Sequence, residues 1–325
     1  MPVAETFTFE DDKGLKLGDV AQIDTMVSVV DGSRFLSELD SLQSLRERNW
    51  QADPDDARTI SHLLCDQVEF ANVIVLNKCD LMNEDEKKEV KKVISLMNPS
   101  ATVVESTYSQ VPLSYVLGTG LFSMSEAEKN DRWLKEARIG EHTPETVEYG
   151  ITSFTYRALK PFYPQKLDNL LMAMLDKEAP FDKSIILRSK GYVWLATYPD
   201  LQGDFSLAGR SFSLVPGNPF WAAIDKEHWP PQLEKDIAPL WNEPYGDRQQ
   251  EIVIIGQQMD NEMITNALNQ CLLSDDDMRK GLDAWRDIED PFSEAWEDAI
   301  NQALVHGNEG DHHTHDHEHG HDHHH

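Results

Sequence analysis

The chain has few cysteines, and they lie far apart. Cys65, Cys79 and Cys271 form no CxxC pair among the 325 residues, so the sequence offers neither a disulfide framework nor a thiolate metal site. Scattered, unpaired cysteines are typical of proteins in a reducing compartment. We therefore expect a cytoplasmic location.

Long apolar runs and basic residues are also scarce. The longest apolar runs are about five residues, against the roughly 20 that a membrane-spanning helix needs. The opening MPVAETF does not have the basic and apolar segments of a secretion signal. With 29 Lys and Arg against 58 Asp and Glu, the net charge is -29, which repels nucleic acid and anionic lipid. These features argue against secretion, membrane insertion and nucleic-acid binding, and they favour cations and basic partners.

The first third of the chain alternates between strand and helix patterns. Short runs rich in β-branched residues, such as NVIVL, are typical of buried parallel strands, and apolar residues at helical spacing separate them. This alternation predicts an α/β layer with a parallel sheet. The predicted strands cover 23–30, 72–76 and 102–105, and the predicted helices cover 34–50, 55–70 and 84–97.

A second pattern follows a polar stretch. Residues 147–272 combine alternating strands, two helices and glycine turns, which predicts an α+β domain. Its strands are expected at 151–158, at 205–207, at 211–215, at 251–256 and as two strands within 186–199 around a Lys190-Gly191 turn; its helices are expected at 165–176 and 262–272. The predicted organisation is 1–122 for the α/β domain, 123–146 for a linker, 147–272 for the α+β domain, 273–305 for an acidic helical extension and 306–325 for a His-rich tail.

One tetrapeptide points to a ligand. Asn77-Lys78-Cys79-Asp80 directly follows the predicted strand NVIVL, and open α/β sheets bind ligands at the carboxyl ends of their strands. It has the form NKxD, in which the Asp accepts hydrogen bonds from guanine N1–H and the 2-amino group while the Lys stem lies along the base. The alternative is an ordinary turn with Asp80 or Asn83 as a helix N-cap. The strand context favours the guanine interpretation.

The phosphate end of a nucleotide site is missing from this sequence. No segment has the GxxxxGK[ST] pattern whose backbone amides and Lys hold phosphates. Asp31 also ends a predicted strand, as a magnesium ligand would, but Asp31-Gly32-Ser33-Arg34 is equally consistent with a capped turn into the next helix. We therefore name no catalytic residue.

Several longer segments carry a family resemblance. They are PVAETFTFED, IDTMVSVVDGSRF, NVIVLNKCDL, NPSATV, NDRWLKEARIGEHTPETVEYGITSFTYRALKPFYPQKL and LRSKGYVWLATYPD. Along nearly its whole length the sequence resembles the CobW family of GTP-dependent metallochaperones, and within it the ZigA-type zinc members.

This resemblance implies an α/β fold in which an incomplete P-loop NTPase-type sheet precedes a smaller CobW C-terminal domain. It transfers Asn77, Lys78 and Asp80 as nucleotide contacts, with Ser106-Thr107 either a second base-contacting loop or a plain turn. PVAETF would follow the family's third βα unit, so about three such units, roughly a hundred residues, would be absent. The P-loop, the switch elements and the CxCC metal site would lie there.

The C-terminus is a run of imidazoles. DHHTHDHEHGHDHHH contains too few apolar residues for a core, so we expect it to be disordered without metal. Closely spaced imidazoles on a flexible chain can converge on one divalent cation, and the resemblance favours zinc over nickel or copper. An expression tag is the alternative, although tags are uniform runs. The predicted ligands are His312, His313, His315, His317, His319, His321, His323, His324 and His325.

The leading hypothesis is a GTP-regulated zinc metallochaperone. GTP would bind through its guanine end, zinc through the tail, and a client metalloprotein through the second domain. GTP hydrolysis is doubtful without a P-loop, whose amides and Lys anchor the triphosphate. The alternative is a non-enzymatic zinc buffer or adaptor that uses the tail and the second domain.

Overall fold

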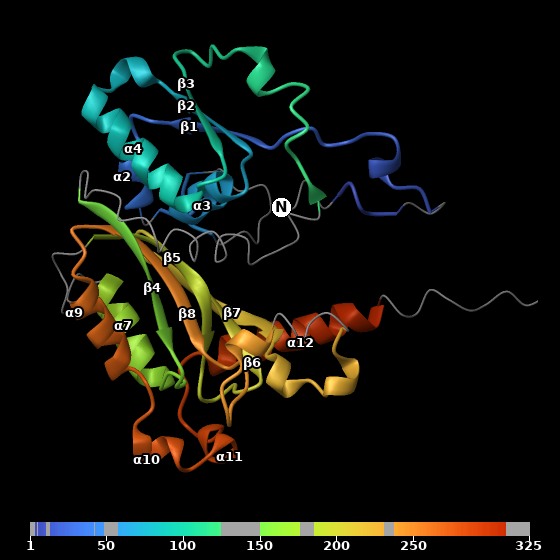
Figure 1. Ribbon diagram of the computed structural model, residues 1–325, viewed down its shortest axis with the longest axis vertical. Helices are drawn as coiled ribbons and strands as arrows, with labels where there is room; N and C mark the ends of the chain where they lie inside the picture. The colour runs from blue at the N-terminus through green and yellow to red at the C-terminus, as the bar shows by residue number, and fades with distance from the viewer. Residues whose placement is uncertain are drawn as a thin grey trace, which may run out of the picture.

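The computed structural model of the protein contains two sheets with helices around them (Figure 1). It describes residues 4, 6–10, 14–41, 43–48, 58–124, 150–175, 185–230 and 237–309. No helix among these residues is both long enough and apolar enough to cross a membrane.

The first sheet is parallel and has the order β1-β2-β3. The central strand β2 is almost wholly apolar and buried, as expected when helices cover a parallel sheet. β1 and β2 are aligned so that Asp31 is paired with Asn77, which brings two predicted site segments to one edge. The elements are β1 (Val27–Asp31), α2 (Phe35–Leu39), α3 (Ile60–Glu69), β2 (Val73–Asn77), α4 (Glu84–Met97) and β3 (Thr102–Glu105).

One face of this sheet is buried against helices and the other is partly bare. Val30, Ile74 and Leu76 belong to the same buried cluster as residues of α3 and α4. On the opposite face Val27 and Val29 are 40% and 57% exposed. Because parallel sheets are ordinarily covered on both faces, this side of β1 is uncovered within the described part of the chain.

The helix predicted over 34–50 is wrong beyond its first turns. Among the described residues of this stretch, 34–41 and 43–48, the helix covers Phe35–Leu39 alone. Farther on, the Leu45 amide donates to the Arg58 carbonyl and the Ile60 amide donates to the Gln43 carbonyl. These bonds pair residues 43–45 with the start of α3, so tertiary pairing overrides the helical spacing of the leucines.

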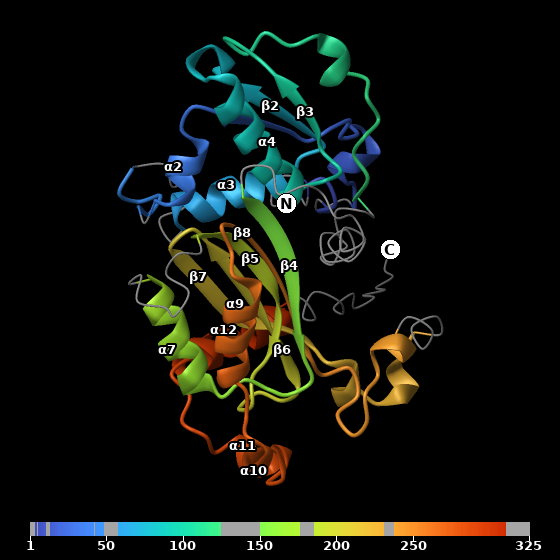
Figure 2. The ribbon, with the colours of Figure 1, turned by 60° about the vertical axis from the view of Figure 1, so that its left-hand side comes forward.

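The second sheet is antiparallel and has the order β4-β8-β5-β6-β7. Helices α7 and α9 pack on one of its faces (Figure 2), where Leu167, Leu171, Ile264 and Leu268 share a buried cluster with strand residues such as Ile254. The predicted class of a parallel α/β sheet followed by an α+β domain is confirmed. The elements are β4 (Ile151–Ala158), α7 (Pro164–Leu175), β5 (Ile185–Trp194), β6 (Leu201–Ala208), β7 (Ser211–Pro219), β8 (Gln250–Gln257) and α9 (Asn261–Gln270).

The turn predicted at Lys190-Gly191 is wrong, because β5 runs through it without interruption. Gly191 lies in the middle of the strand, opposite β8 on one side and β6 on the other. A Cβ atom at this position would stand 2.0 Å from the Glu251 carbonyl oxygen. The glycine therefore marks a close backbone approach and not a chain reversal.

Replacing this glycine should destabilise the second domain. We expect Gly191→Ala to lower the free energy of unfolding by about 1–3 kcal/mol, the usual cost of overpacking, as measured by urea denaturation. Gly118→Ala is the control: Ala is strained there by the left-handed φ of 67°, but its Cβ would meet nothing within 4 Å, so this variant measures backbone strain without a close approach. Equal losses in the two variants would show that the approach to Glu251 is not the cause.

Residues after 272 fold back onto the second domain. They form α10 (Asp275–Met278), α11 (Leu282–Trp285) and α12 (Ser293–Glu309). Trp285 and Trp296 are both completely buried, Trp285 against Trp194 and Trp296 in the cluster beneath α7 and α9. This acidic segment therefore supplies core side chains to the domain that precedes it.

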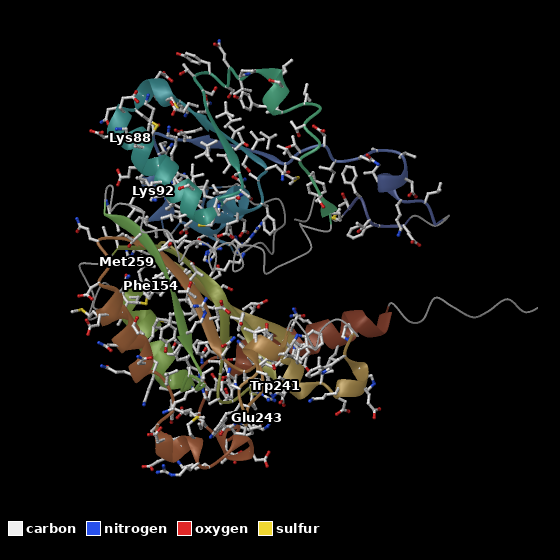
Figure 3. All side chains as sticks on the ribbon, in the orientation of Figure 1. Lys88, Lys92, Phe154, Trp241, Glu243 and Met259 are labelled. Atoms are coloured by element: carbon white, nitrogen blue, oxygen red, sulfur yellow. The ribbon has the colours of Figure 1, made fainter. Side chains whose placement is uncertain are left out.

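Three further tryptophans form a small cluster in the segment of chain that connects β7 to β8. The Trp229 ring contacts both Trp221 and Trp241, and the Lys226 ammonium lies 5.5 Å from the centroids of Trp229 and Trp241. The Trp241 indole donates to Glu243, and both residues are labelled in Figure 3. The contacts between the rings, the Lys226 ammonium and the Trp241–Glu243 hydrogen bond stabilise this connecting segment.

The two sheets share a core. Ile151, Ala208, Val253 and Ile255 of the second sheet belong to the same buried cluster as residues of β1, β2 and α2–α4. At the tip of the β6–β7 hairpin, Gly209 has a φ of 54°, and a Cβ there would lie 1.8 Å from the Leu39 carbonyl oxygen. The second domain is therefore packed directly against the helices of the first.

A buried ion pair crosses this interface. Glu69, at the end of α3, accepts from Arg188 Nε at 2.6 Å, from Arg188 Nη2 at 3.1 Å and from Lys190 Nζ at 3.1 Å. The side chains of Arg188 and Glu69 are only 3% and 8% exposed. Burial opposes ionisation of Glu69, but the two cations outweigh it and hold the pKa of its carboxyl below the ordinary value. Their position at the C-terminus of α3 also suits the helix dipole.

Candidate functional site

The NKCD loop lies where the sequence predicted it, at the carboxyl end of β2. The strand is buried until Leu76, and the chain then turns sharply because Lys78 adopts a left-handed conformation with a φ of 61°. A short 3-10 turn follows over Cys79–Leu81. Non-glycine residues rarely adopt this conformation, because it costs free energy. They do so mainly where function or packing fixes the backbone.

Asn77 ties this loop to the one that follows β3. Its side-chain amide donates to Ser109 Oγ at 3.1 Å, and its side-chain oxygen accepts from the Ser109 amide at 2.9 Å. The Cys79 amide also donates to the Ser106 carbonyl. The loop of residues 106–110 therefore lies directly beside NKCD, where a second base-contacting loop would be needed.

Lys78 and Asp31 are ion-paired at the edge of the sheet. Lys78 Nζ lies 2.7 Å from Asp31 Oδ2, and the Ser33 hydroxyl donates to Asp31 Oδ1 at 2.7 Å. Partial burial opposes ionisation, but the Lys78 and Ser33 contacts hold the pKa of Asp31 below its ordinary value. Asp31 thus serves to position Lys78, and its carbonyl also accepts from the Arg34 amide in a turn.

Asp80 is left available. The N-cap of α4 is Asn83, whose side chain accepts from the Asp85 and Glu86 amides while Glu86 bonds back to the Asn83 amide. Asp80 is exposed, and its carboxylate has no hydrogen bond or ion pair with any residue that the structure describes. The N-cap alternative is therefore wrong for Asp80 and confirmed for Asn83. The two carboxylate oxygens of Asp80 are free to accept hydrogen bonds from a ligand.

The predicted metal ligands cannot be placed. All nine histidines from His312 to His325 lie outside the described residues. Elsewhere in the described chain, no group of three or more His, Cys, Asp or Glu side chains is arranged to hold a metal ion. Burial raises the pKa of Cys65 to about 12 and that of Cys271 to about 11, so both remain protonated thiols and poor ligands. The tail remains the predicted metal site.

Sequence reasoning missed the contacts that organise the loop. The Lys78–Asp31 pair could have been inferred from strand alignment, since both residues follow strands that lie side by side. The bonds between Asn77 and Ser109 had no such signal, because they depend on the backbone of a loop 32 residues away.

An open parallel sheet with an NKxD loop at the carboxyl end of a strand is the arrangement of a guanine-nucleotide-binding domain. The family model described as the CobW/HypB/UreG nucleotide-binding domain matches residues 1–105, and that of the CobW C-terminal domain matches residues 151–272. The chain belongs to the CobW family.

Individual proteins are similar over most of the chain. A zinc-regulated GTPase metalloprotein activator of Dictyostelium discoideum is 44% identical, over 90% of this chain and 61% of that protein. A zinc chaperone of Mycobacterium tuberculosis is 25% identical, over 79% of this chain and 62% of that protein. The crystal structure of the zinc-bound YjiA GTPase from E. coli is 17% identical, with a TM-score of 0.32, over 84% of this chain and 67% of that chain. The chain thus spans less than two thirds of the length of the curated relatives it matches.

Proposed function

We propose that this chain recognises guanine nucleotides and binds zinc as part of a GTP-regulated zinc metallochaperone. The observation that carries the proposal is the free carboxylate of Asp80 in a loop held by Asn77 and Lys78. A carboxylate that accepts two hydrogen bonds selects guanine, because adenine has no matching pair of donors. The names of the similar proteins, a zinc-regulated GTPase metalloprotein activator and a zinc chaperone, agree with this function.

Guanine recognition, and not hydrolysis, is the part we assign to these residues. No segment of the sequence has the phosphate-binding GxxxxGK[ST] pattern. The second domain would dock a client metalloprotein in the cytoplasm, and the His-rich tail would collect the metal to be delivered.

Nucleotide titration calorimetry tests the guanine assignment. We expect GTP, GDP and GMP to bind with similar affinity, because the base supplies the contacts, and ATP not to bind. Equal binding of ATP and GTP would contradict base recognition by Asp80. Zinc binding without any nucleotide binding would favour the zinc buffer or adaptor instead.

Removal of the tail should remove most zinc sites. We expect a chain ending at residue 305 to bind fewer zinc ions per molecule than the full chain in a calorimetric titration. A full-length variant with the nine tail histidines replaced by Ser is the matched control and should behave like the shortened chain. Because neutral imidazole is the ligand, zinc affinity of the full chain should fall below a pH of about 6.5. An unchanged stoichiometry after either alteration would contradict the tail assignment.

A further inference from the structure

The loop beside NKCD holds an aromatic residue in an unusual conformation. Tyr108 and Ser109 have φ angles of 53° and 56°, so two consecutive non-glycine residues are left-handed. For an aromatic residue this conformation is a genuine outlier, and it persists only when neighbouring contacts fix it.

Those contacts are present on both sides of Tyr108. Ser109 makes two hydrogen bonds with Asn77, as described above. The Gln110 amide donates to the Thr107 carbonyl at 3.1 Å, and the Ser106 hydroxyl donates to the Gln110 carbonyl at 3.2 Å. The backbone that presents Tyr108 is therefore anchored to the same asparagine that shapes the NKCD loop.

The Tyr108 side chain is left in the open. It is 84% exposed, the largest fraction among the large hydrophobic side chains of the described residues. Leaving an aromatic ring in water forgoes the free energy of burying it, and fixing its backbone in a left-handed conformation costs more. A ligand that covered the ring would offset both.

A guanine base held by Asp80 would have one face without a protein contact. Asp80 would bond the edge of guanine, and the Lys78 stem would lie along one of its faces. The other face needs a planar apolar partner, and base–aromatic stacking is favourable for every base because each has a π-face.

We propose that Tyr108 stacks on the nucleobase held by Asp80 and is a base-contacting residue of this site. The inference rests on the proposed guanine recognition. It assigns affinity to Tyr108 and selectivity to Asp80, because stacking tolerates any base whereas the carboxylate does not.

The test uses the full chain labelled with 3-fluorotyrosine and titrated with GMP. The chain has 8 tyrosines, and the ¹⁹F resonance of Tyr108 is assigned by its loss in Tyr108→Phe. We expect GMP to shift this resonance saturably through the ring current of the base. Tyr115, which is 42% exposed in the neighbouring segment, should not shift.

Affinities of variants give the second readout. Tyr108→Ala should weaken GMP binding about tenfold or more, which is the usual effect of removing a stacking ring. Tyr108→Phe and Tyr108→Trp should bind within about twofold of the parent, since the ring and not the hydroxyl makes the contact. Tyr115→Ala is the matched control and should not differ from the parent.

The outcomes separate the two proposals. If Tyr108→Ala binds GMP like the parent while Asp80→Ala does not bind, the stacking role is wrong and guanine recognition stands. If the parent itself binds no GMP, both are wrong. If Tyr108→Phe loses as much affinity as Tyr108→Ala, the hydroxyl makes the contact and stacking is again wrong.

Discussion

Glu69→Leu should be the most damaging single substitution at the domain interface, lowering the free energy of unfolding by about 3–5 kcal/mol. The loss follows from what remains, because Arg188 is only 3% exposed and would be left buried without its counter-charge. Lys190 is 29% exposed and can turn toward water. Equilibrium denaturation in urea, followed by circular dichroism, measures the change.

A double variant shows whether the isolated charge is the cause. Glu69→Leu combined with Arg188→Met removes both buried charges and should recover most of the lost stability, since an apolar pair of similar volume can replace a buried ion pair. Lys280→Ala breaks an exposed pair with Asp277 and should change stability by about 1 kcal/mol or less. A double variant as unstable as the single one would show that the loss comes from packing.

The acid dependence of stability provides another readout of the same pair. The folded-state pKa of Glu69 lies below its ordinary value of 4.5, since burial, which would raise it, is outweighed by Arg188 and Lys190. Its contribution is therefore fully present above pH 4.5 and is lost as the pH falls through the folded-state value. The stability difference between the parent and Glu69→Leu should narrow over that acidic range.

Asp80→Asn should change which base the site prefers. The Asp80 carboxylate can accept from both N1–H and the 2-amino group of guanine. An amide presents one acceptor and one donor, which match N1–H and the 2-carbonyl oxygen of xanthine. We expect the ratio of GMP to XMP affinity to fall by about 100-fold or more, because unmatched polar groups are rejected strongly. Competitive titration calorimetry measures both affinities.

A control separates charge from position. Asp85→Asn makes the same chemical change nearby, in the first turn of α4, and should leave the preference for GMP intact. If Asp80→Asn keeps the parent's preference, the NKCD loop does not recognise the base edge and the proposed function fails there.

Local patterns were sufficient for most of the elements. Runs of β-branched residues located β1, β2 and β3, and apolar spacing located α3, α4, α7 and α9. These elements could be predicted because each one's burial is visible in its own periodicity. The outcome at 34–50 differed because residues 43–45 bond to the start of α3, a partner that periodicity cannot reveal.

Glycine was the harder residue to interpret. Gly191 follows Lys190 as a turn glycine would, but it lies within the strand β5. Glycine is required there because the neighbouring strand β8 leaves no space for a Cβ atom. Gly209 lies between the strands expected at 205–207 and 211–215, as a turn glycine would, yet its close approach to Leu39 depends on the packing of the two domains. A sequence shows that a glycine is present without showing which neighbour requires it.

The site was predicted in part. The position of NKCD follows from the hydrophobic strand before it, and that part of the sequence reasoning located the loop correctly. Which side chains remain available depends on partners distant in sequence, such as Ser109 for Asn77 and Asp31 for Lys78. Asp80 could be recognised as available only after Asn83 was seen to cap α4.

Strand β2 connects the interface to the nucleotide loop. Glu69 ends α3, with three residues between it and the start of β2, and Asn77 is the last residue of β2. The five residues of β2, about 17 Å of extended chain, therefore make up most of the path from the inter-domain charges to the candidate base site. β2 is bonded to β1 on one side and to β3 on the other, and a strand held in this way cannot lengthen. β2 is therefore a short, laterally bonded path within the first sheet that runs from the ion pair at the domain interface to the candidate base site.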